Sequence, residues 1–215
     1  VCDDQNIDVS KIEAAITPRT KAIMPVHWSG RIANMDAIMA IAKKHNLIVI
    51  EDAAQSMGAY YRGKHGGSFG DAAAYSAHPL KNLNALGDAG FMSTNDDEVN
   101  RKVRLYRTHG LESRDNCVLY GVNSRLDSLN AEVLKYRLER LKAIVDRRRH
   151  NVELYKSIIK QGSIFIPPEK PEEHNSYVMF ITQADQRDKL KDYLQSHDIE
   201  SLVYYGTPLH LHKAA

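Results

Sequence analysis

A single lysine, Lys81, occupies the stretch YSAHPLKNLNALGDAGF, and no helical period or close charged neighbour surrounds it. It follows a proline and precedes a Gly-Asp-Ala-Gly turn, so we expect its amine to be partly withdrawn from water. A desolvated lysine has a lowered pKa and becomes a nucleophile towards an aldehyde. Ser76 stands five residues earlier, and a hydroxyl beside backbone amides at a turn can hold a phosphate. Taken alone, such a lysine is more often an ordinary surface residue.

A carboxylate and an amide precede this stretch. Asp52 ends the apolar run LIVIED, and Gln55 follows three residues later. A carboxylate at the end of a buried strand must be paired or it takes up a proton, and a protonated ring nitrogen is one suitable partner. With Lys81 and Ser76, these residues describe a site for pyridoxal phosphate (PLP), in which the lysine forms the Schiff base and Asp52 keeps the pyridine nitrogen protonated. The alternative interpretation of Asp52 and Gln55 is an acid and an amide in a surface loop.

The elements around Asp52 predict an α/β fold. Residues 21–28 and 47–52 are apolar runs typical of buried strands, and a helix N-capped by Asn34 should run between them to about residue 46. Strand, helix and strand in this order form a βαβ unit, which favours a mostly parallel sheet with a right-handed crossover. In such sheets ligands bind beyond the carboxyl ends of the strands.

Further elements are expected on both sides of Lys81. We expect short strands at 72–77 and 90–95, a helix from Asp96 or its neighbour to about His109, and a loop over 110–123.

The chain divides into two lobes joined by a helix. Residues 1–126 would form part of a large PLP-binding domain. Across 127–161 apolar side chains recur at threes and fours, which predicts one continuous helix of unusual length linking the lobes. Residues 162–215 would begin a small α+β lobe, built from SYVMFIT, a helix over 186–197 and IESLVYY.

Composition excludes several classes of function. The chain is 43% hydrophobic with a net charge of +2, and no apolar run approaches the roughly 20 residues that span a membrane. The basic run DRRRH at 146–150 is typical of a solvated helix face rather than a nucleic-acid patch. Cys2 and Cys117 are isolated, which fits a reducing cytoplasm and argues against a zinc site or a disulfide. We therefore expect no metal, membrane or nucleic-acid role.

The stretch IEDAAQSMGAYYRGKHGGSFGDAAAYSAHPLKNLNALGDAGF closely resembles the core motif of the DegT-type nucleotide-sugar aminotransferases, a branch of the fold-type-I PLP enzymes. TKAIMPVHWSGRIANMDAI, GVNSRLDSLNAEVLKYRL and PLHL resemble further motifs of that family, in family order. The resemblance covers nearly all of the chain and implies a fold-type-I large domain. Two departures are an Ala at position 89 where the family usually has Gly, and the apparent absence of the family's N-terminal portion, which supplies a phosphate-binding turn and a ring stacked on the cofactor.

The resemblance implies a role for each of four residues. Lys81 matches the Schiff-base lysine that also shuttles a proton during the reaction. Asp52 matches the partner of the pyridinium nitrogen, Gln55 the residue beside the cofactor's phenolic oxygen, and Ser76 a phosphate ligand.

Three more residues lie in stretches that resemble less specific motifs of the family. Asn123 matches an asparagine that reaches the phosphate from the neighbouring subunit, which implies a homodimer with shared active sites. His27 and His210 match histidines on the substrate side of the site. The alternative for His27 is a core or strand-end histidine, and for His210 a solvated loop histidine.

By resemblance, the reaction is transfer of an amino group from an amino acid, expected to be glutamate, to a nucleotide-linked keto-sugar in amino-sugar or polysaccharide biosynthesis. The nucleotide, the sugar and the aminated carbon stay open. A cyclitol aminotransferase and a truncated, non-catalytic PLP-fold protein remain as alternatives. Related sugar dehydratases carry His in place of the lysine, so Lys81 argues against them.

Overall fold

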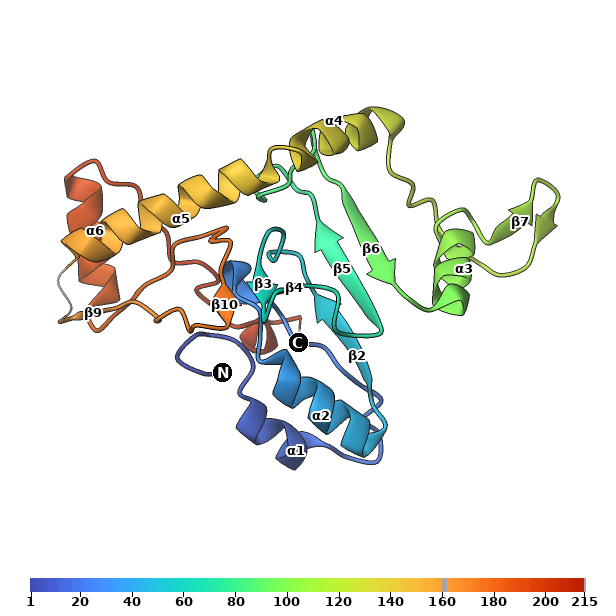
Figure 1. The fold of residues 1–215 in the computed structure, drawn as a ribbon, viewed down its shortest axis with the longest axis horizontal. Coiled ribbons are helices and arrows are strands. Elements are labelled where there is room, and N and C mark those ends of the chain that lie inside the picture. Colours follow the sequence, from blue (N-terminus) through green and yellow to red (C-terminus); the bar gives the residue numbers. More distant parts are fainter. Residues whose placement is uncertain (160–161, 215) are drawn as a thin grey trace.

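A four-stranded sheet forms the centre of the molecule, and the computed structural model describes residues 1–159 and 162–214. In spatial order its strands are β1 (Ala22–Ile23), β2 (Ile48–Asp52), β5 (Ala72–Ser76) and β6 (Gly90–Thr94). The first three strands are parallel, and β6 is antiparallel to β5 (Figure 1). The prediction of an α/β fold with a mostly parallel sheet is therefore confirmed.

Helix α2 (Met35–His45) covers one face of this sheet. Asn34 caps its first turn, because the side-chain oxygen accepts a hydrogen bond from the Ala37 N–H at 3.2 Å. Met35 and Ile38 are fully buried, and they pack in the same core as Val49 of β2. This helix, its cap and its apolar face were predicted from the sequence.

The opposite face of β1 and β2 is bare. Burial alternates along β2, with Val49 buried while Ile48 and Ile50 are 53% and 39% exposed. Met24, beside β1, is 64% exposed. Parallel strands are normally covered on both faces, so the described residues supply one of the two layers that such a sheet needs.

The first predicted strand is shorter than expected. Residues 21–28 contribute only the two residues of β1 and an isolated bridge between Val26 and Asp52. The physical reason is Pro25, which has no N–H to donate to the ladder but still accepts from the Asp52 N–H at 2.9 Å.

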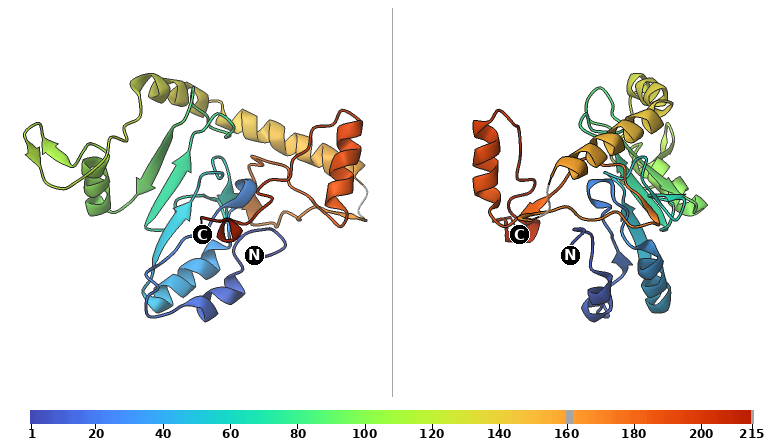
Figure 2. Two further views of the ribbon diagram at one scale, coloured as in Figure 1. Left: turned by 180° about the vertical axis from the view of Figure 1, so that it is seen from behind. Right: turned by 60° about the vertical axis from the view of Figure 1, so that its left-hand side comes forward.

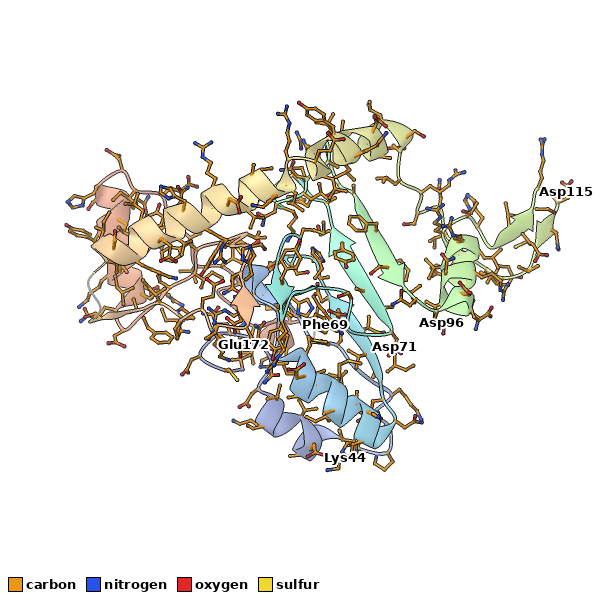
Figure 3. All side chains as sticks on the ribbon, viewed as in Figure 1. Lys44, Phe69, Asp71, Asp96, Asp115 and Glu172 are labelled. Carbon is orange, nitrogen blue, oxygen red and sulfur yellow. The ribbon has the colours of Figure 1, made fainter. Side chains whose placement is uncertain are left out.

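An arm projects from the far end of β6. It consists of α3 (Asp97–Tyr106) and a hairpin of β7 (Leu111–Ser113) and β8 (Asn116–Cys117). The helix was expected, but a loop was expected in place of the hairpin. Figure 3 labels Asp96 at the start of the arm and Asp115 at the tip of its hairpin. We call residues 97–123 the arm.

The predicted linking helix is broken in two. Helix α4 (Ser128–Leu138) ends and α5 (Leu141–Ile158) begins after a turn at Glu139 and Arg140, where the Arg140 N–H bonds to the Arg137 carbonyl. The apolar period continues through the turn because Leu134, Leu141 and Val145 enter one core cluster. Periodicity therefore could not reveal the break, and the expected helix end at 160–161 lies outside the described residues.

The C-terminal part contains less regular structure than predicted. Helix α6 (Arg187–Ser196) lies where a helix was expected and stands apart from the central sheet (Figure 2). SYVMFIT and IESLVYY form no strand in the described residues. The backbone at Ser176 and Val178 instead donates to Gly30 and Ser29 at 2.9 and 3.1 Å, so this segment pairs with a loop and not with a sheet.

The remaining elements are short. A three-stranded sheet contains β3 (Tyr60–Tyr61), β4 (Lys64–His65) and β10 (Glu173–His174), a two-stranded sheet contains β9 (Ile164–Phe165) and β11 (Gln183–Ala184), and the short helices are η1 (Val9–Lys11), α1 (Ile12–Ala15), η2 (Trp28–Gly30) and η3 (Leu209–Leu211).

The basic run on α5 is only partly solvated. Arg148 donates to the carbonyls of Tyr177 and Val178 at 3.2 and 3.1 Å, and Arg149 donates to Glu169 at 2.6 Å and to the Asn175 carbonyl at 2.8 Å. The prediction of a solvated face was wrong for these two arginines, because α5 packs along the segment that the sequence assigned to a separate lobe.

Candidate active site

The carboxyl ends of β2 and β5 meet at one edge of the sheet. Asp52, the last residue of β2, is in register with Ala74 of β5, and the Ala53 N–H donates to the Ala74 carbonyl at 2.9 Å. Ser76, the last residue of β5, lies two residues further along. Parallel pairing thus brings a carboxylate and a hydroxyl to the edge where ligands bind in this class of sheet.

The turn after β5 carries Lys81 to this edge. The Ser76 hydroxyl accepts a hydrogen bond from the His78 N–H at 3.3 Å, and the Lys81 N–H donates to the His78 carbonyl at 2.9 Å. The chain is therefore folded tightly between the serine and the lysine, as the proline in this stretch suggested.

Lys81 and Asp52 act on each other electrostatically. Burial lowers the pKa of the half-buried Lys81 amine, and the charge of Asp52 opposes that shift. Asp52 is therefore close enough to the Lys81 amine for its charge to affect the pKa of that amine. A partly desolvated amine carries its proton less firmly, which is the property that a lysine nucleophile needs.

Gln55 is fixed by a backbone contact. Its side chain is buried, and its amide oxygen accepts from the Ser29 N–H at 2.6 Å. Ser29 holds the left-handed conformation, with φ of 55°. The oxygen of Gln55 is thus occupied, and its NH₂ group is the part available to a ligand.

An aromatic cluster stands beside Asp52. The Trp28 ring lies 6.2 Å from the ring of Tyr204 and 5.4 Å from that of Tyr205. Burial, then the neighbouring Tyr204, and finally the charge of Asp52 raise the pKa of Tyr205. The C-terminal part of the chain therefore reaches the Asp52 end of the sheet, which no motif in the sequence indicated.

His27 does not face this site. Its side chain is fully buried, its Nε2 lies 2.7 Å from a Glu51 oxygen, and its Nδ1 accepts from the Ala33 N–H at 3.3 Å. Both ring nitrogens are used inside the protein, so the expectation of a substrate-side histidine is corrected in favour of the alternative, a core histidine.

Asn123 and His210 are both exposed, and both belong to elements other than the turn that carries Lys81. Asn123 is exposed on the arm, where it bridges to Thr108 and its side-chain oxygen accepts from Arg125 at 3.1 Å. His210 is exposed on η3. That Asn123 reaches the cofactor phosphate and that His210 approaches the substrate therefore stay predictions.

Two residues that the motif contained received no role from the sequence. Glu51 is fully buried beside Asp52, and Asn82 is buried directly after Lys81. The sequence could have indicated both residues by their position next to a candidate catalytic residue. Neighbouring side chains point to opposite sides of a strand or turn, so a polar residue in that position faces the protein interior. What each one binds depends on residues distant in the sequence.

Hollows elsewhere on the surface do not belong to this site. One of about 480 Å³ lies on the arm, between α3 and residues 118–119, and one of about 580 Å³ lies between α5 and residues 166–173. None of Asp52, Ser76 and Lys81 lines either of them.

Two features are absent from the part of the chain that the structure describes. No helix among residues 1–159 and 162–214 is long and apolar enough to cross a bilayer. In the same residues, no three His, Cys, Asp or Glu side chains gather as they would around a metal ion.

Comparison with known proteins agrees with this geometry. The chain is 42% identical over 209 residues to a pleiotropic regulatory protein of Geobacillus stearothermophilus, covering 96% of this chain and 56% of that protein. It is 43% identical over 209 residues to dTDP-3-amino-3,6-dideoxy-alpha-D-galactopyranose transaminase of Aneurinibacillus thermoaerophilus, covering 97% and 58%. The crystal structure of S. venezuelae DesV in complex with a ketimine intermediate matches with a TM-score of 0.93 and 37% identity, covering 97% and 57%.

The chain therefore spans a little over half the length of the curated relatives it matches. A family model matches residues 2–215. The chain belongs to the DegT/DnrJ/EryC1/StrS aminotransferase family.

Proposed function

We propose that this protein is a PLP-dependent aminotransferase that moves an amino group from an amino acid, expected to be glutamate, to a nucleotide-linked keto-sugar. The observation that carries the proposal is the placement of Asp52 and Ser76 at the carboxyl ends of β2 and β5, with the half-buried Lys81 in the turn that follows β5. A half-buried amine opposite a carboxylate suits a cofactor that has an aldehyde at one position and a basic ring nitrogen at another.

The groups at this edge fit PLP by their chemistry. Asp52 has one side-chain oxygen bonded to the Ala54 N–H at 3.1 Å, and a carboxylate can accept further hydrogen bonds. Gln55 offers its NH₂ group to a phenolic oxygen, and Ser76 offers its hydroxyl to a phosphate. Lys81 supplies the amine for the aldehyde.

Bound PLP supplies an electron sink that stabilises the carbanion left when the donor loses its α-proton. In this proposal, the Lys81 amine would take that proton and later release it. Asp52 accepts a hydrogen bond from the protonated ring nitrogen and holds the proton there. Gln55 and Ser76 orient the ring by donating to its phenolic oxygen and its phosphate.

The proposed class of substrate is based on the names of similar proteins. The Aneurinibacillus protein, 43% identical to this chain, is named as a transaminase of a dTDP-linked amino sugar. We propose a nucleotide-linked keto-sugar as the amino acceptor, with the product destined for a polysaccharide or another amino-sugar product. A free keto-inositol stays as the second acceptor to test, because the cofactor residues would be the same.

A non-catalytic role is a second candidate, favoured by one observation. The Geobacillus relative, 42% identical to this chain, carries a regulatory name. A protein of that kind would bind the cofactor without transferring the amino group, so binding and turnover have to be measured separately.

We propose a homodimer in which Asn123 serves the site of the partner subunit. The support is the arm, on which Asn123 is exposed together with Tyr106, Val118 and Tyr120, the last of them 98% exposed. Exposed apolar side chains on a projecting element mark an interaction surface.

We also propose that residues 1–126 belong to a large domain, 127–161 to a connection, and 162–215 to part of a small domain. The course of α5 from the end of the sheet towards α6 supports this division (Figure 1). Cys2 and Cys117 are free and exposed, which supports a reducing, cytoplasmic location.

An amino-transfer assay tests the proposed function. The protein is incubated with PLP, glutamate and a panel of keto-sugars linked to dTDP or UDP, with a free keto-inositol as a further arm, and 2-oxoglutarate and the amino product are measured. Product from a nucleotide-linked arm supports the proposal. Product from the keto-inositol alone contradicts the substrate class, and bound PLP without turnover in any arm contradicts catalysis and favours the regulatory candidate.

A further inference from the structure

Asn82, which directly follows Lys81, is bonded to a distant segment. Its side chain is buried, and its Nδ2 donates to the Ser176 carbonyl at 2.9 Å and to the Met57 carbonyl at 3.4 Å. The contact with Ser176 joins residues 94 positions apart in the sequence. The turn that carries the reactive lysine is therefore held from the C-terminal side of the molecule.

The same segment also reaches Gln55. The Ser176 N–H donates to the Gly30 carbonyl at 2.9 Å, and the Val178 N–H donates to the Ser29 carbonyl at 3.1 Å. Ser29 in turn donates its own N–H to the side chain of Gln55 at 2.6 Å. We call residues 175–178 the linking segment, because it binds next to two of the proposed cofactor residues.

Close packing keeps the linking segment and the Ser29 loop in one arrangement. Gly30 has φ of +90°, and a Cβ at this position would lie 2.5 Å from the Ser176 hydroxyl and 2.9 Å from the Tyr177 nitrogen. A side chain there would be strained in conformation and would clash. The contact thus depends on a glycine.

Helix α5 fixes the other side of the linking segment. Arg148 is half-buried and donates to two consecutive carbonyls, those of Tyr177 and Val178. Arg149 donates to the Asn175 carbonyl at 2.8 Å. The segment therefore lies between α5 and the turn that holds the lysine, in contact with both.

We propose that Asn82 is a positioning residue for Lys81, and that the linking segment sets the place of the lysine through it. The proposal rests on the proposed function, because it concerns the same site. The amide donor of Asn82 holds the turn against the Ser176 carbonyl, and this contact keeps the lysine beside Asp52. A shift of α5 relative to the sheet would move the linking segment, and through Asn82 it would change the position of Lys81.

The test measures the amine itself, without the cofactor. Labelling of Lys81 by a small amine-reactive reagent is followed by mass spectrometry over a pH series, and its midpoint reports the pKa of the amine. Burial lowers that pKa, so a loosened turn moves the midpoint towards that of exposed lysines. Asn82→Leu removes the donor while keeping a similar volume, and Asn82→Ala is the second variant. We expect the midpoint to move to higher pH in both.

A matched control lies in the same turn. Asn84 donates its amide to the Pro79 carbonyl at 2.9 Å and its side-chain oxygen accepts from Arg137, so Asn84→Ala removes two hydrogen bonds of this turn without touching the linking segment. It should leave the midpoint unchanged. Arg148→Met removes the hydrogen bonds that hold the linking segment against α5. It should move the labelling midpoint in the same direction as the Asn82 variants. A midpoint that moves as much in Asn84→Ala as in Asn82→Leu overturns the proposal.

Cofactor capture separates this proposal from the proposed function. Capture of PLP on Lys81 by borohydride should be slower in Asn82→Leu, by about tenfold, because misplacement of a reacting group costs rate steeply. A wild-type protein that captures no PLP contradicts the proposed function, while the labelling midpoints still decide the role of Asn82. Midpoints and capture rates equal to wild type in folded Asn82→Leu and Arg148→Met, with only the melting temperature lowered, contradict the positioning role.

Discussion

The Glu51 carboxylate, one residue before Asp52, lies 2.7 Å from Nε2 of His27 inside the protein. Three backbone N–H groups donate to the same carboxylate at 2.7 Å, those of Gly67, Phe69 and Gly70. Because Nδ1 of His27 accepts from a backbone N–H, its Nε2 carries the proton and donates it to Glu51. Four donors thus converge on one buried carboxylate, and they hold the loop before β5, where Figure 3 labels Phe69, against the end of β2.

Glu51→Gln should destabilise the protein by about 3 kcal/mol, because one acceptor oxygen becomes an NH₂ group that faces N–H donors. Urea unfolding followed by circular dichroism measures the change. Glu13→Gln is the matched control, since Glu13 accepts from Lys44 and His45 at 2.7 Å on the exposed surface, and it should leave the midpoint close to wild type. A Glu51→Gln protein as stable as the control would contradict this account of the buried carboxylate.

The contribution of Glu51 should depend on pH in a defined direction. Burial alone would raise its pKa, but the hydrogen bonds from His27, Gly70 and Gly67 outweigh burial and hold the pKa below its usual value. A group with a lowered folded-state pKa stabilises the protein fully above its unfolded-state pKa, about 4.3 for glutamate, and loses that effect as the pH falls through the folded-state value. The stability gap between wild type and Glu51→Gln should therefore be constant from about pH 5 to 7 and shrink below about pH 4. A gap that widens on acidification would show that the carboxylate is protonated in the folded state.

Asp52→Asn should lower the pH midpoint for labelling of Lys81. Burial lowers the pKa of this amine and Asp52 partly offsets the effect, so removing the charge leaves burial unopposed. Asp88→Asn, at a fully exposed carboxylate in the following turn, is the control and should leave the midpoint in place. An unchanged midpoint in Asp52→Asn would mean that the two side chains do not share a site.

Asn123→Ala should weaken retention of PLP by about tenfold, the loss expected when one charge-assisted hydrogen bond to phosphate is removed. Equilibrium dialysis measures retention, and sedimentation should still show a dimer. Mixed dimers test the shared site further: a Lys81→Ala subunit paired with an Asn123→Ala subunit should have one intact site and one doubly impaired site. A monomer that retains PLP as well as the dimer does would overturn the shared-site proposal.

The sequence predicted the parts of the site that depend on local order. Asp52 at a strand end, Ser76 and Lys81 across a proline turn, and the Asn34 cap of α2 all follow from short-range patterns, and the structure has each of them in the expected element. The motif spacing alone therefore predicted where Asp52, Ser76 and Lys81 lie along the strands and the turn, while their roles in catalysis stay predictions.

Contacts between distant segments could not be predicted. The turn at Glu139 and Arg140 interrupts a helix whose apolar period continues undisturbed. SYVMFIT has the composition of a strand, yet Tyr177 holds a left-handed φ of 45° and its neighbours pair with a loop. The burial of His27 likewise depends on Glu51, 24 residues later. In each case tertiary packing decided between local conformations that the sequence alone leaves equally open.

The most direct test of the central claim, that Lys81 and Asp52 form one PLP site, is covalent capture. The intact protein is mixed with PLP, reduced with borohydride and digested, and mass spectrometry locates the phosphopyridoxyl group. We expect that Lys81 carries the group, that Lys81→Ala abolishes capture, and that Lys102→Ala, a change at an exposed lysine paired with Glu98, leaves it intact. Modification spread over surface lysines, with Lys81 no more labelled than Lys102, would contradict the account.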